Sequence, residues 1–445
     1  MTKAQVDAVD CPVQIIVVDA EDDIPSLSAI RPDGSRWSGS WVVVRSAGVV
    51  VGVREVAFDG RDVVSAAELR SLVTAATRDV PPRELLPVAD GDLPSISVVV
   101  PSDLRRTDQL RTALAALDGL DYPDFEVLLV DNHRDDQAED PLPGIVDGLD
   151  RVRVVREPIP GISAARNAGI ESARGDVVAF TDDDVRVDPQ WLRALGTRFA
   201  LRPDEDAVTG LILPAELETI AQLWFERHYG GFGGTRSFAP LTYRGAEPTD
   251  PIARRTKVSV RDWSGHEVRT FTLYGAGVAG AGANMAFRID ALRRAGGFDV
   301  ALGTGTPARG GEDLAMIISL LWEGGAIGYE PAALVWHTHR ADYPSLRTQI
   351  QGYGLGFTAT LSSLIRADPR HGLGLVLLAP AVLRAMLPRK GLQREGAGGT
   401  RPSPAVGPPA PSELTWLAHR GGLRGPGAYL RSRREARRRT GRPRW

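Results

Sequence analysis

Three consecutive aspartates are the first candidates for chemistry in this sequence. The apolar run 177–180 leads almost directly into Asp182–Asp184. Neighbouring carboxylates repel one another, so a cation or hydrogen-bond donors must compensate them in a folded protein. On an extended chain Asp182 and Asp184 point to the same side, and such a pair suits Mg²⁺ or Mn²⁺, which typically also bind substrate phosphates. The alternative is an acid-rich helix start, because a helix is expected soon after residue 189.

A second acidic pair, Glu312 and Asp313, follows Gly310 and Gly311 and opens a helical pattern. The two glycines allow the loop to move or a ligand to approach closely. A carboxylate on such a hinge fits a general base. The alternative is helix capping, since acids are favoured in a first helical turn.

Two histidines, His337 and His339, follow an apolar strand-like run. Residues i and i+2 of an extended segment face one side, and two imidazoles there suit a metal or a phosphate. A single histidine is more often structural. The sequence does not decide between His337 and His339 as the ligand.

Familiar nucleotide-binding and hydrolase motifs are absent from the chain. Residues 161–167 open a helix after a strand, so their backbone N–H groups could face a phosphate. The sequence has no Walker A loop there and no G-x-G-x-x-G after its first strand, which argues against a nicotinamide enzyme. It also has no G-x-S-x-G elbow, so a serine hydrolase has no support.

The elements that must position these residues alternate between strand and helix. Strand-like runs lie at 96–100, 125–130, 152–155 and 177–180, with helical patterns at 108–120 and 163–173, Ser163 being the predicted N-cap. This alternation predicts a parallel sheet covered by helices on both faces. Ligands bind beyond the carboxyl ends of such strands, where Asp131 and Asp182–Asp184 lie. Residues 230–282 are glycine-rich and are expected to form long loops over the site.

Composition shifts suggest the domain organisation of the 445 residues. The single cysteine, Cys11, excludes an internal disulfide framework and a cysteine-based zinc site. No run of 18 apolar residues is present, so a conventional membrane-spanning helix is not expected. We predict a small α+β module (1–80), a proline-rich linker (81–95), a large α/β domain (96–365), an apolar helical segment (366–400), and a proline-rich linker with an arginine-rich tail (401–445).

The C-terminal tail concentrates positive charge. From Arg420 to Trp445 there are ten arginines and one acid, a net charge of +9, which leaves −12 for the rest of a chain whose formal total is −3. One interpretation is a solvated, partly disordered tail. The other is a clamp onto anionic lipid headgroups. No recognised nucleic-acid-binding fold is present, so no nucleic-acid partner is predicted.

Taken in order, these residues resemble the family 2 glycosyltransferases, which have the GT-A fold. The resemblance covers about residues 95–360, and its motifs lie at 96–101, 122–132, 161–169, 179–184, 282–288, 296–299, 311–314 and 337–340. It implies an α/β fold with a Rossmann-like, mostly parallel central sheet and flanking helices. The small N-terminal α+β module and the basic, partly disordered C-terminal tail are additions to this fold.

The resemblance also implies roles for the donor-side residues. Asp131 would contact the nucleobase of a nucleoside diphosphate-sugar, and Pro101 and Ser102 would line the same pocket. Asp182 and Asp184 look like the D-x-D pair that touches the ribose and the metal-bound diphosphate.

The remaining implied roles concern the diphosphate, the metal and the acceptor. Asp183 is counted with the donor-binding residues, and Arg166 would reach the diphosphate. Asp313 looks like the catalytic base, and Glu312 beside it, also counted as catalytic, would orient the base or bind the acceptor. His337 would complete a Mg²⁺ or Mn²⁺ site with Asp182 and Asp184.

The implied activity is inverting, metal-assisted transfer of a sugar to an acceptor hydroxyl, by an enzyme of the hexosyltransferase type. The Q-x-x-R-W signature of processive members is absent, so a non-processive enzyme is predicted. We expect a cytoplasmic protein, and peripheral contact with the inner face of the membrane is an alternative. A lipid-linked molecule is one of the candidate acceptors. Residues 101–107 depart from the family pattern, which leaves the nucleotide and the sugar open. The other candidates are a sugar-phosphate nucleotidyltransferase, for which Arg105 and Arg106 supply charge but no glycine-rich loop follows the first strand, and a catalytically inactive scaffold.

Overall fold

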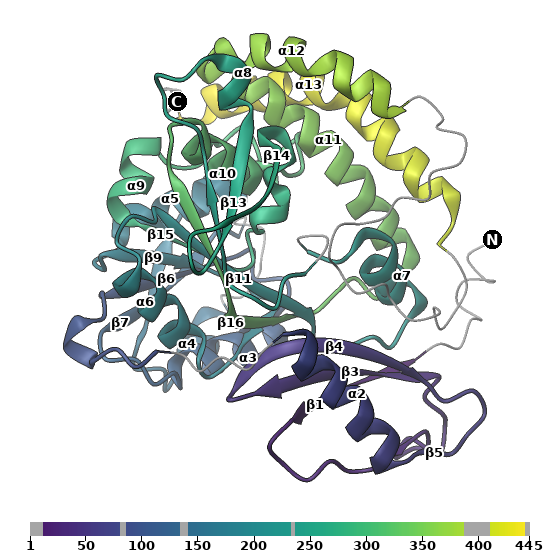
Figure 1. The fold of residues 1–445 in the computed structure, drawn as a ribbon. Coiled ribbons are helices and arrows are strands. Elements are labelled where there is room, and N and C mark those ends of the chain that lie inside the picture. Colours follow the sequence, from purple (N-terminus) through teal and green to yellow (C-terminus); the bar gives the residue numbers. More distant parts are fainter. Residues whose placement is uncertain (1–11, 81–85, 134–140, 233–235, 387–409, 441–445) are drawn as a thin grey trace.

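The computed structural model describes residues 12–80, 86–133, 141–232, 236–386 and 410–440 (Figure 1). Cys11, the first five residues of the predicted linker, residues 387–409 and the last five residues of the tail lie outside this range. The domain boundaries given above stay predictions.

The N-terminal residues form a small sheet with one helix packed on it. Strands β1 (Val13–Asp19), β3 (Gly39–Ser46) and β4 (Val49–Ala57) lie in the order β1-β3-β4, and the short strands β2 (Leu27–Ser28) and β5 (Val63–Val64) pair separately. Strands β3 and β4 pair as an antiparallel hairpin whose turn has Ala47 and Gly48 in the left-handed region (φ 49° and 76°). Helix α2 (Ala66–Asp79) begins at Ser65, whose hydroxyl accepts a hydrogen bond from the Glu68 N–H.

This small module packs against the main sheet. Val43 and Val50 share one buried cluster with four residues of the main sheet: Leu211, Leu213, Leu334 and Trp336. Two ion pairs, Arg45–Asp188 and Arg227–Glu55, cross the same boundary. The module therefore supports the end of the main sheet at which strand β16 (Ala326–His337) finishes.

The main sheet runs in the order β14-β13-β12-β16-β11-β15-β9-β6-β7-β8. Its first half is the predicted parallel unit: β6 (Ile96–Ser102), β7 (Phe125–Asp131), β8 (Val152–Arg156) and β9 (Val177–Phe180). Helices α3 (Thr107–Asp118) and α6 (Trp191–Leu201) cover one face, and α5 (Ile162–Ser172), α9 (Ile289–Ala295) and α10 (Glu312–Trp322) cover the other. Along β6, Val98 and Val100 pack on the first face and Val99 on the second, because side chains alternate along a strand.

The second half of the sheet is mixed. Strand β15 (Met285–Arg288) runs antiparallel to both β9 and β11 (Ala207–Pro214), and β11 pairs in parallel with β16 (Ala326–His337). The predicted α/β fold with a central sheet and flanking helices is confirmed. Strands β6, β7, β8 and β9 are parallel to one another and β11 is parallel to β16, whereas the other pairings in this sheet are antiparallel.

Part of the segment predicted as long loops is a sheet extension. Strands β12 (Leu241–Arg244), β13 (Lys257–Asp262) and β14 (Glu267–Thr272) form an antiparallel edge, with α8 (Ile252–Arg255) and the 3-10 helix η2 (Leu273–Ala279) around it. The loop prediction is therefore wrong for residues 241–272. Only Val258 and Val260 of β13 are fully buried and most of β14 is exposed, which explains the weak apolar pattern.

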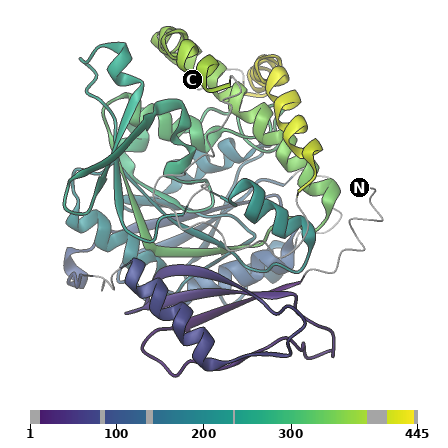
Figure 2. The same cartoon turned by 45° about the vertical axis from the view of Figure 1, so that its right-hand side comes forward.

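Three long helices complete the C-terminal part: α11 (Tyr343–Ala367), α12 (Arg370–Met386) and α13 (Ser412–Thr440). Helices α12 and α13 both pack on α11 and lie on the same side of the molecule (Figures 1 and 2). No helix in the described part of the chain combines the length and the apolar character that crossing a membrane requires.

Helix α13 takes the place of the partly disordered tail that we expected over residues 412–440. A stripe of apolar and small residues faces inward, and its members are Leu414, Leu417, Gly421, Gly425, Ala428 and Ser432. A Cβ atom at Gly425 would lie only 1.9 Å from Thr358 Oγ1, so the backbones of α11 and α13 come very close. This stripe is what orders the segment, and its glycines gave no apolar signal in the sequence.

Candidate active site

The predicted donor-side residues meet at the carboxyl ends of β6, β7 and β9. Ser102 and Asp131 lie side by side in the parallel register of β6 and β7, and Pro101 is buried one position earlier. The Ser102 hydroxyl donates a hydrogen bond to Asp183 Oδ2 at 2.6 Å. Polar residues stand at or just after the end of each of these strands. Because the strands are parallel, their carboxyl ends lie at one edge of the sheet, and the polar side chains come together there, as the sequence predicted.

Asp182, Asp184 and His337 form a cluster that fits a metal ion. One ligand atom from each of these residues lies within 4.8 Å of the others. His337 reaches the cluster because β10 (Val185–Val187) pairs antiparallel with β16, which puts Val185 opposite His337. Asp184 Oδ1 is buried without a hydrogen-bond partner and lies 3.4 Å from His337 Nε2. Asp182 and Asp184 each offer a carboxylate oxygen and His337 offers a ring nitrogen, which is a set of ligand atoms that a divalent cation can bind. Such a cation would also give the buried Asp184 Oδ1 the partner that it lacks.

The two histidines face different partners. His339 Nε2 lies 2.6 Å from Glu226 Oε1 of α7 (Ile220–Tyr229), and Glu226 also pairs with Arg236. His337 instead faces Asp184, and burial lowers its pKa to about 4, so its ring is neutral near pH 7. A neutral imidazole is the form that binds metals. The geometry therefore places His337 with the carboxylates and His339 with Glu226.

Arg106 is a site residue that the sequence analysis did not select. It precedes α3 and makes ion pairs with both Asp183 and Asp184. The signal available in the sequence was the pair Arg105–Arg106 just after the first strand, which we interpreted only as local charge. Its guanidinium offsets part of the repulsion between the adjacent carboxylates. Burial nevertheless raises the pKa of Asp183 above its ordinary value.

Arg166 connects the aspartate cluster to the second acidic pair. Its guanidinium lies 2.8 Å from Glu312 Oε1 and 3.4 Å from Asp182 Oδ1, and it donates to the Gly282 carbonyl oxygen at 3.2 Å. The side chain is only 1% exposed. The contacts described for Arg166 are thus with the protein, and its predicted reach to a diphosphate stays a prediction. The helix that carries it begins at Ile162 after Gly161 (φ 132°), and Ser163 is not its N-cap, because the Ser163 hydroxyl donates instead to the Leu302 carbonyl.

Glu312 and Asp313 open α10 at the rim of this network. Burial, reinforced by Asp313, raises the pKa of Glu312 to about 7, although Arg166 acts in the opposite direction. Burial likewise raises the pKa of Asp182 to about 6. Asp313 is half-buried and accepts a hydrogen bond from the Gly282 N–H at 2.9 Å. The arrangement holds Asp313 in a fixed position while leaving part of it accessible.

The loop before α10 needs glycine at one position. Gly311 has φ 88°, and a Cβ atom there would lie 2.2 Å from Thr360 Oγ1 and 2.7 Å from the Gly356 carbonyl oxygen of α11. Thr360 also donates to the Gly311 carbonyl at 2.8 Å. At Gly310, in contrast, an added Cβ atom would meet no heavy atom within 4 Å. Helix α11 therefore fixes the backbone that leads into Glu312 and Asp313.

Asp131 ends β7 and is 1% exposed. One of its oxygens contacts His133 Nδ1, and the other lies 3.1 Å from Arg156 Nε. It lies at the carboxyl edge of the sheet, as predicted, and both of its oxygens face positively charged or hydrogen-bonding side chains.

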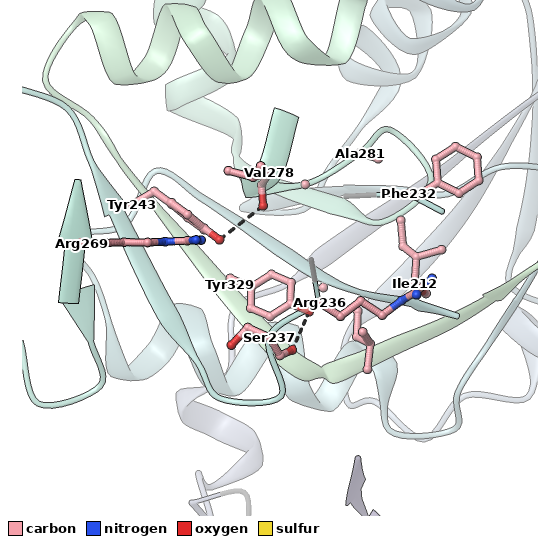
Figure 3. Close-up of a pocket in the computed structure, with 12 residues that line it drawn as sticks. Ile212, Phe232, Arg236, Ser237, Tyr243, Arg269, Val278, Ala281 and Tyr329 are labelled. Carbon is pink, nitrogen blue, oxygen red and sulfur yellow. Dashed lines mark hydrogen bonds between the residues drawn. The ribbon is translucent and has the colours of Figure 1, made fainter. Parts of the chain in front are cut away.

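A pocket lies next to this site, on the β11–β12–β14 side of the sheet (Figure 3). It encloses about 420 Å³, part of it open to solvent, and it is lined by aromatic and basic side chains that include Phe232, Tyr243, Tyr329, Arg236 and Arg269. The Tyr243 hydroxyl donates to the Val278 carbonyl and the Tyr329 hydroxyl to the Ser237 carbonyl. Phe232 links the pocket to the site, since its ring centroid lies 4.5 Å from that of His337. The pocket lining contains none of the site residues predicted from the sequence.

Part of the chain is similar to known proteins. Residues 97–276 match the family model described as glycosyl transferase family 2. The chain is 32% identical over 103 residues to glycosyltransferase AglE of Haloferax volcanii (22% of this chain, 34% of that protein). It is 28% identical over 180 residues to pre-mycofactocin glycosyltransferase of Mycobacterium tuberculosis (40% of this chain, 30% of that protein). The matched segments span between 16% and 38% of the length of these and the other curated relatives.

A solved structure has a weak overall similarity to this chain. Mannosyltransferase PcManGT from Pyrobaculum calidifontis, in complex with GDP-Man and Mn²⁺, superposes with a TM-score of 0.40 at 16% sequence identity, over 70% of this chain and 84% of that chain.

The family match and the sequence relatives indicate that the matched segment is that of a glycosyltransferase. More narrowly, the chain carries a family 2 glycosyltransferase domain, and the resemblance seen in the sequence is confirmed.

Proposed function

We propose that this protein transfers a sugar from a nucleoside diphosphate-sugar to an acceptor hydroxyl with inversion at the anomeric carbon. The observation that carries the proposal is the cluster of Asp182, Asp184 and His337 at the strand ends, connected through Arg166 to the acidic pair at the start of α10. We assign the activity to residues 96–365.

The donor would bind across the carboxyl ends of β6, β7 and β9. Asp131 and Ser102 are neighbours in the sheet register, so both can contact the nucleoside part. Asp182, Asp184 and His337 would hold Mg²⁺ or Mn²⁺. Bound there, the cation would stabilise the negative charge that develops on the departing diphosphate.

Asp313 would accept the proton of the acceptor hydroxyl. Its carboxylate is fixed by the Gly282 N–H and is half-buried at the mouth of the network. Glu312, paired with Arg166, would keep the start of α10 in place. A diphosphate leaves without protonation, so one base and one displacement suffice, in contrast to glycoside hydrolases with their two carboxylates.

Replacing Asp313 by Asn tests the base assignment. Positioned base catalysis contributes about 10²–10⁴-fold, so Asp313→Asn is expected to lower the transfer rate by that factor with little change in donor affinity. The matched control is Asp290→Asn, which removes an exposed acid from the first turn of α9. Near-full turnover in Asp313→Asn would contradict the assignment.

The donor and acceptor need a direct screen. Purified protein would be melted with UDP-, dTDP- and GDP-sugars, each with Mn²⁺ or with a chelator, because a ligand of the folded state raises the melting temperature. A metal-dependent shift with one base identifies the donor. The absence of any shift and of any transfer would favour the inactive scaffold.

A further inference from the structure

The outward face of α13 carries large apolar side chains. Trp416, Leu423 and Leu430 are 54%, 88% and 54% exposed. They are seven residues apart, which places them on one side of a helix. This side is opposite the stripe that packs on α11. Single exposed apolar residues are ordinary, but a row of three along one helix is a surface that no other part of the described chain covers.

Arginines run alongside this apolar row. On a helix of 3.6 residues per turn, Arg420, Arg424, Arg431, Arg434 and Arg438 lie on the same side as the row, and all five are exposed. The guanidinium of Arg420 lies 5.0 Å from the centroid of the Trp416 ring. The helix contains two acids, Glu413, which lies close to Tyr343 and Arg347, and Glu435, which is half-buried. The exposed face is therefore both apolar and strongly positive.

Helix α12, which also packs on α11 and lies on the same side of the molecule (Figures 1 and 2), carries exposed apolar side chains of its own. Leu373, Val376 and Leu377 are 51%, 66% and 50% exposed, at the i, i+3, i+4 spacing of one helix face.

We propose that the outward face of α13 docks on a membrane surface that carries anionic lipid headgroups. Helices that lie in the membrane interface combine Trp and Leu on the apolar side with Lys and Arg that meet the headgroups. Nucleic acid would meet the arginines but would leave the row Trp416–Leu423–Leu430 without a partner. A second copy of the chain would bring two arginine faces together, which the like charges oppose.

This docking face lies directly over the loop that leads to the candidate base. On the inner side of α13, the Ser432 hydroxyl accepts a hydrogen bond from the Ala308 N–H at 3.1 Å, and the Tyr429 hydroxyl donates to Asp299 Oδ2 at 2.8 Å. Only α13 itself, about 10–12 Å across, separates the proposed membrane surface from residues 299–308. Docking would thus bring the start of α10 close to an acceptor that stays in the membrane. The docking proposal itself does not depend on the proposed sugar transfer.

The charge part of the proposal is tested by sedimentation with vesicles. The full chain is mixed with phosphatidylcholine vesicles or with vesicles that contain phosphatidylglycerol in equal part, at about 0.1 M and about 1 M salt. We expect binding only to the anionic vesicles and loss of binding at high salt. Each arginine near such a surface contributes about fivefold to partitioning, so Arg424→Gln/Arg431→Gln should bind about 25-fold more weakly. The control Arg70→Gln/Arg293→Gln removes two exposed arginines, one on α2 and one on α9, and should bind like the wild type.

The apolar part is tested by Leu423→Ser, since Leu423 is the most exposed of the row. We expect a weaker affinity for anionic vesicles and a smaller blue shift of the Trp416 fluorescence on binding. Val268→Ser on β14, 54% exposed, is the matched control. Unchanged melting temperatures establish that all variants are folded.

Binding to neither vesicle would overturn the proposal. Equal binding by the arginine variant and its control would do the same. Concentration-dependent self-association lost in Leu423→Ser, or preferential binding to an RNA homopolymer over the anionic vesicles, would assign the face to another occupant. Loss of vesicle binding with intact sugar transfer to a soluble acceptor would separate this proposal from the proposed function.

Discussion

The glycine before the acidic pair offers the sharpest test of how this fold positions its candidate base. Ala at Gly311 must adopt a left-handed conformation, which costs about 1–2 kcal/mol. Its Cβ would also overlap Thr360 Oγ1 and the Gly356 carbonyl oxygen, at 2.2 Å and 2.7 Å. Overpacking of this kind costs about 1–3 kcal/mol. Together these effects predict that Gly311→Ala loses about 2–5 kcal/mol of stability.

Both stability and turnover report on this change. For a domain of this size about 1 kcal/mol corresponds to about 2 °C, so the melting temperature should fall by about 4–10 °C. Relief of the overlap requires the loop or α11 to move, and a displacement of about 1 Å at a catalytic group can cost about 100-fold in rate. The assay is sugar transfer with saturating donor, measured well below the melting temperature of the variant.

Gly310→Ala is the matched control, because its added Cβ meets nothing within 4 Å. It should melt and turn over like the wild type. If Gly311→Ala behaves like Gly310→Ala, then the contact between α11 and the hinge does not position Asp313, and the assignment of that loop is wrong.

Further predictions concern the cluster of carboxylates and histidines. Asp184→Asn should abolish the rise in melting temperature that Mn²⁺ gives in the presence of the donor, and an unchanged rise would exclude Asp184 as a ligand. His337→Ala should weaken Mn²⁺ binding at least about tenfold in a thermal titration, with only a small loss of stability in the metal-free protein. His339→Ala should behave in the opposite way, since it removes one hydrogen-bond partner of the buried Glu226 carboxylate, which Arg236 still contacts, and a hydrogen bond to a charged group contributes about 1.5–3 kcal/mol. Arg106→Gln should tighten Mn²⁺ binding by about tenfold, because the guanidinium competes with a cation for the same carboxylates, and calorimetric titration that finds equal or weaker binding would contradict this competition.

The part of the fold that sequence reasoning captured is the part in which local pattern and burial agree. The strands β6, β7 and β9 are apolar on both faces because helices cover both sides of the sheet. Such runs are visible without any partner. Once their parallel order is assumed, Ser102, Asp131 and Asp182 must come together at one edge.

The missing parts depend on pairings between distant segments. His337 was grouped with the aspartates only through the family resemblance, because it reaches Asp184 through the antiparallel pairing of β10 with β16, which no local pattern encodes. Arg106 could not be selected because its partners are defined by the fold and not by its neighbours in sequence. Helix α13 was missed because Gly421 and Gly425 interrupt the apolar pattern of its buried stripe, and glycine is a poor helix former.

The position of β15 and β16 in the sheet bears on how the protein can be divided. The family match ends at residue 276, whereas β15 lies between β9 and β11, and β16 lies between β11 and β12. A fragment that stopped at the end of the match would therefore lose two interior strands and split its sheet, in addition to losing Asp313 and His337. The unit that can be expressed, exchanged or duplicated is larger than the recognisable motif. It has to include the sheet through β16 and the helix α11 that supports the hinge at Gly311.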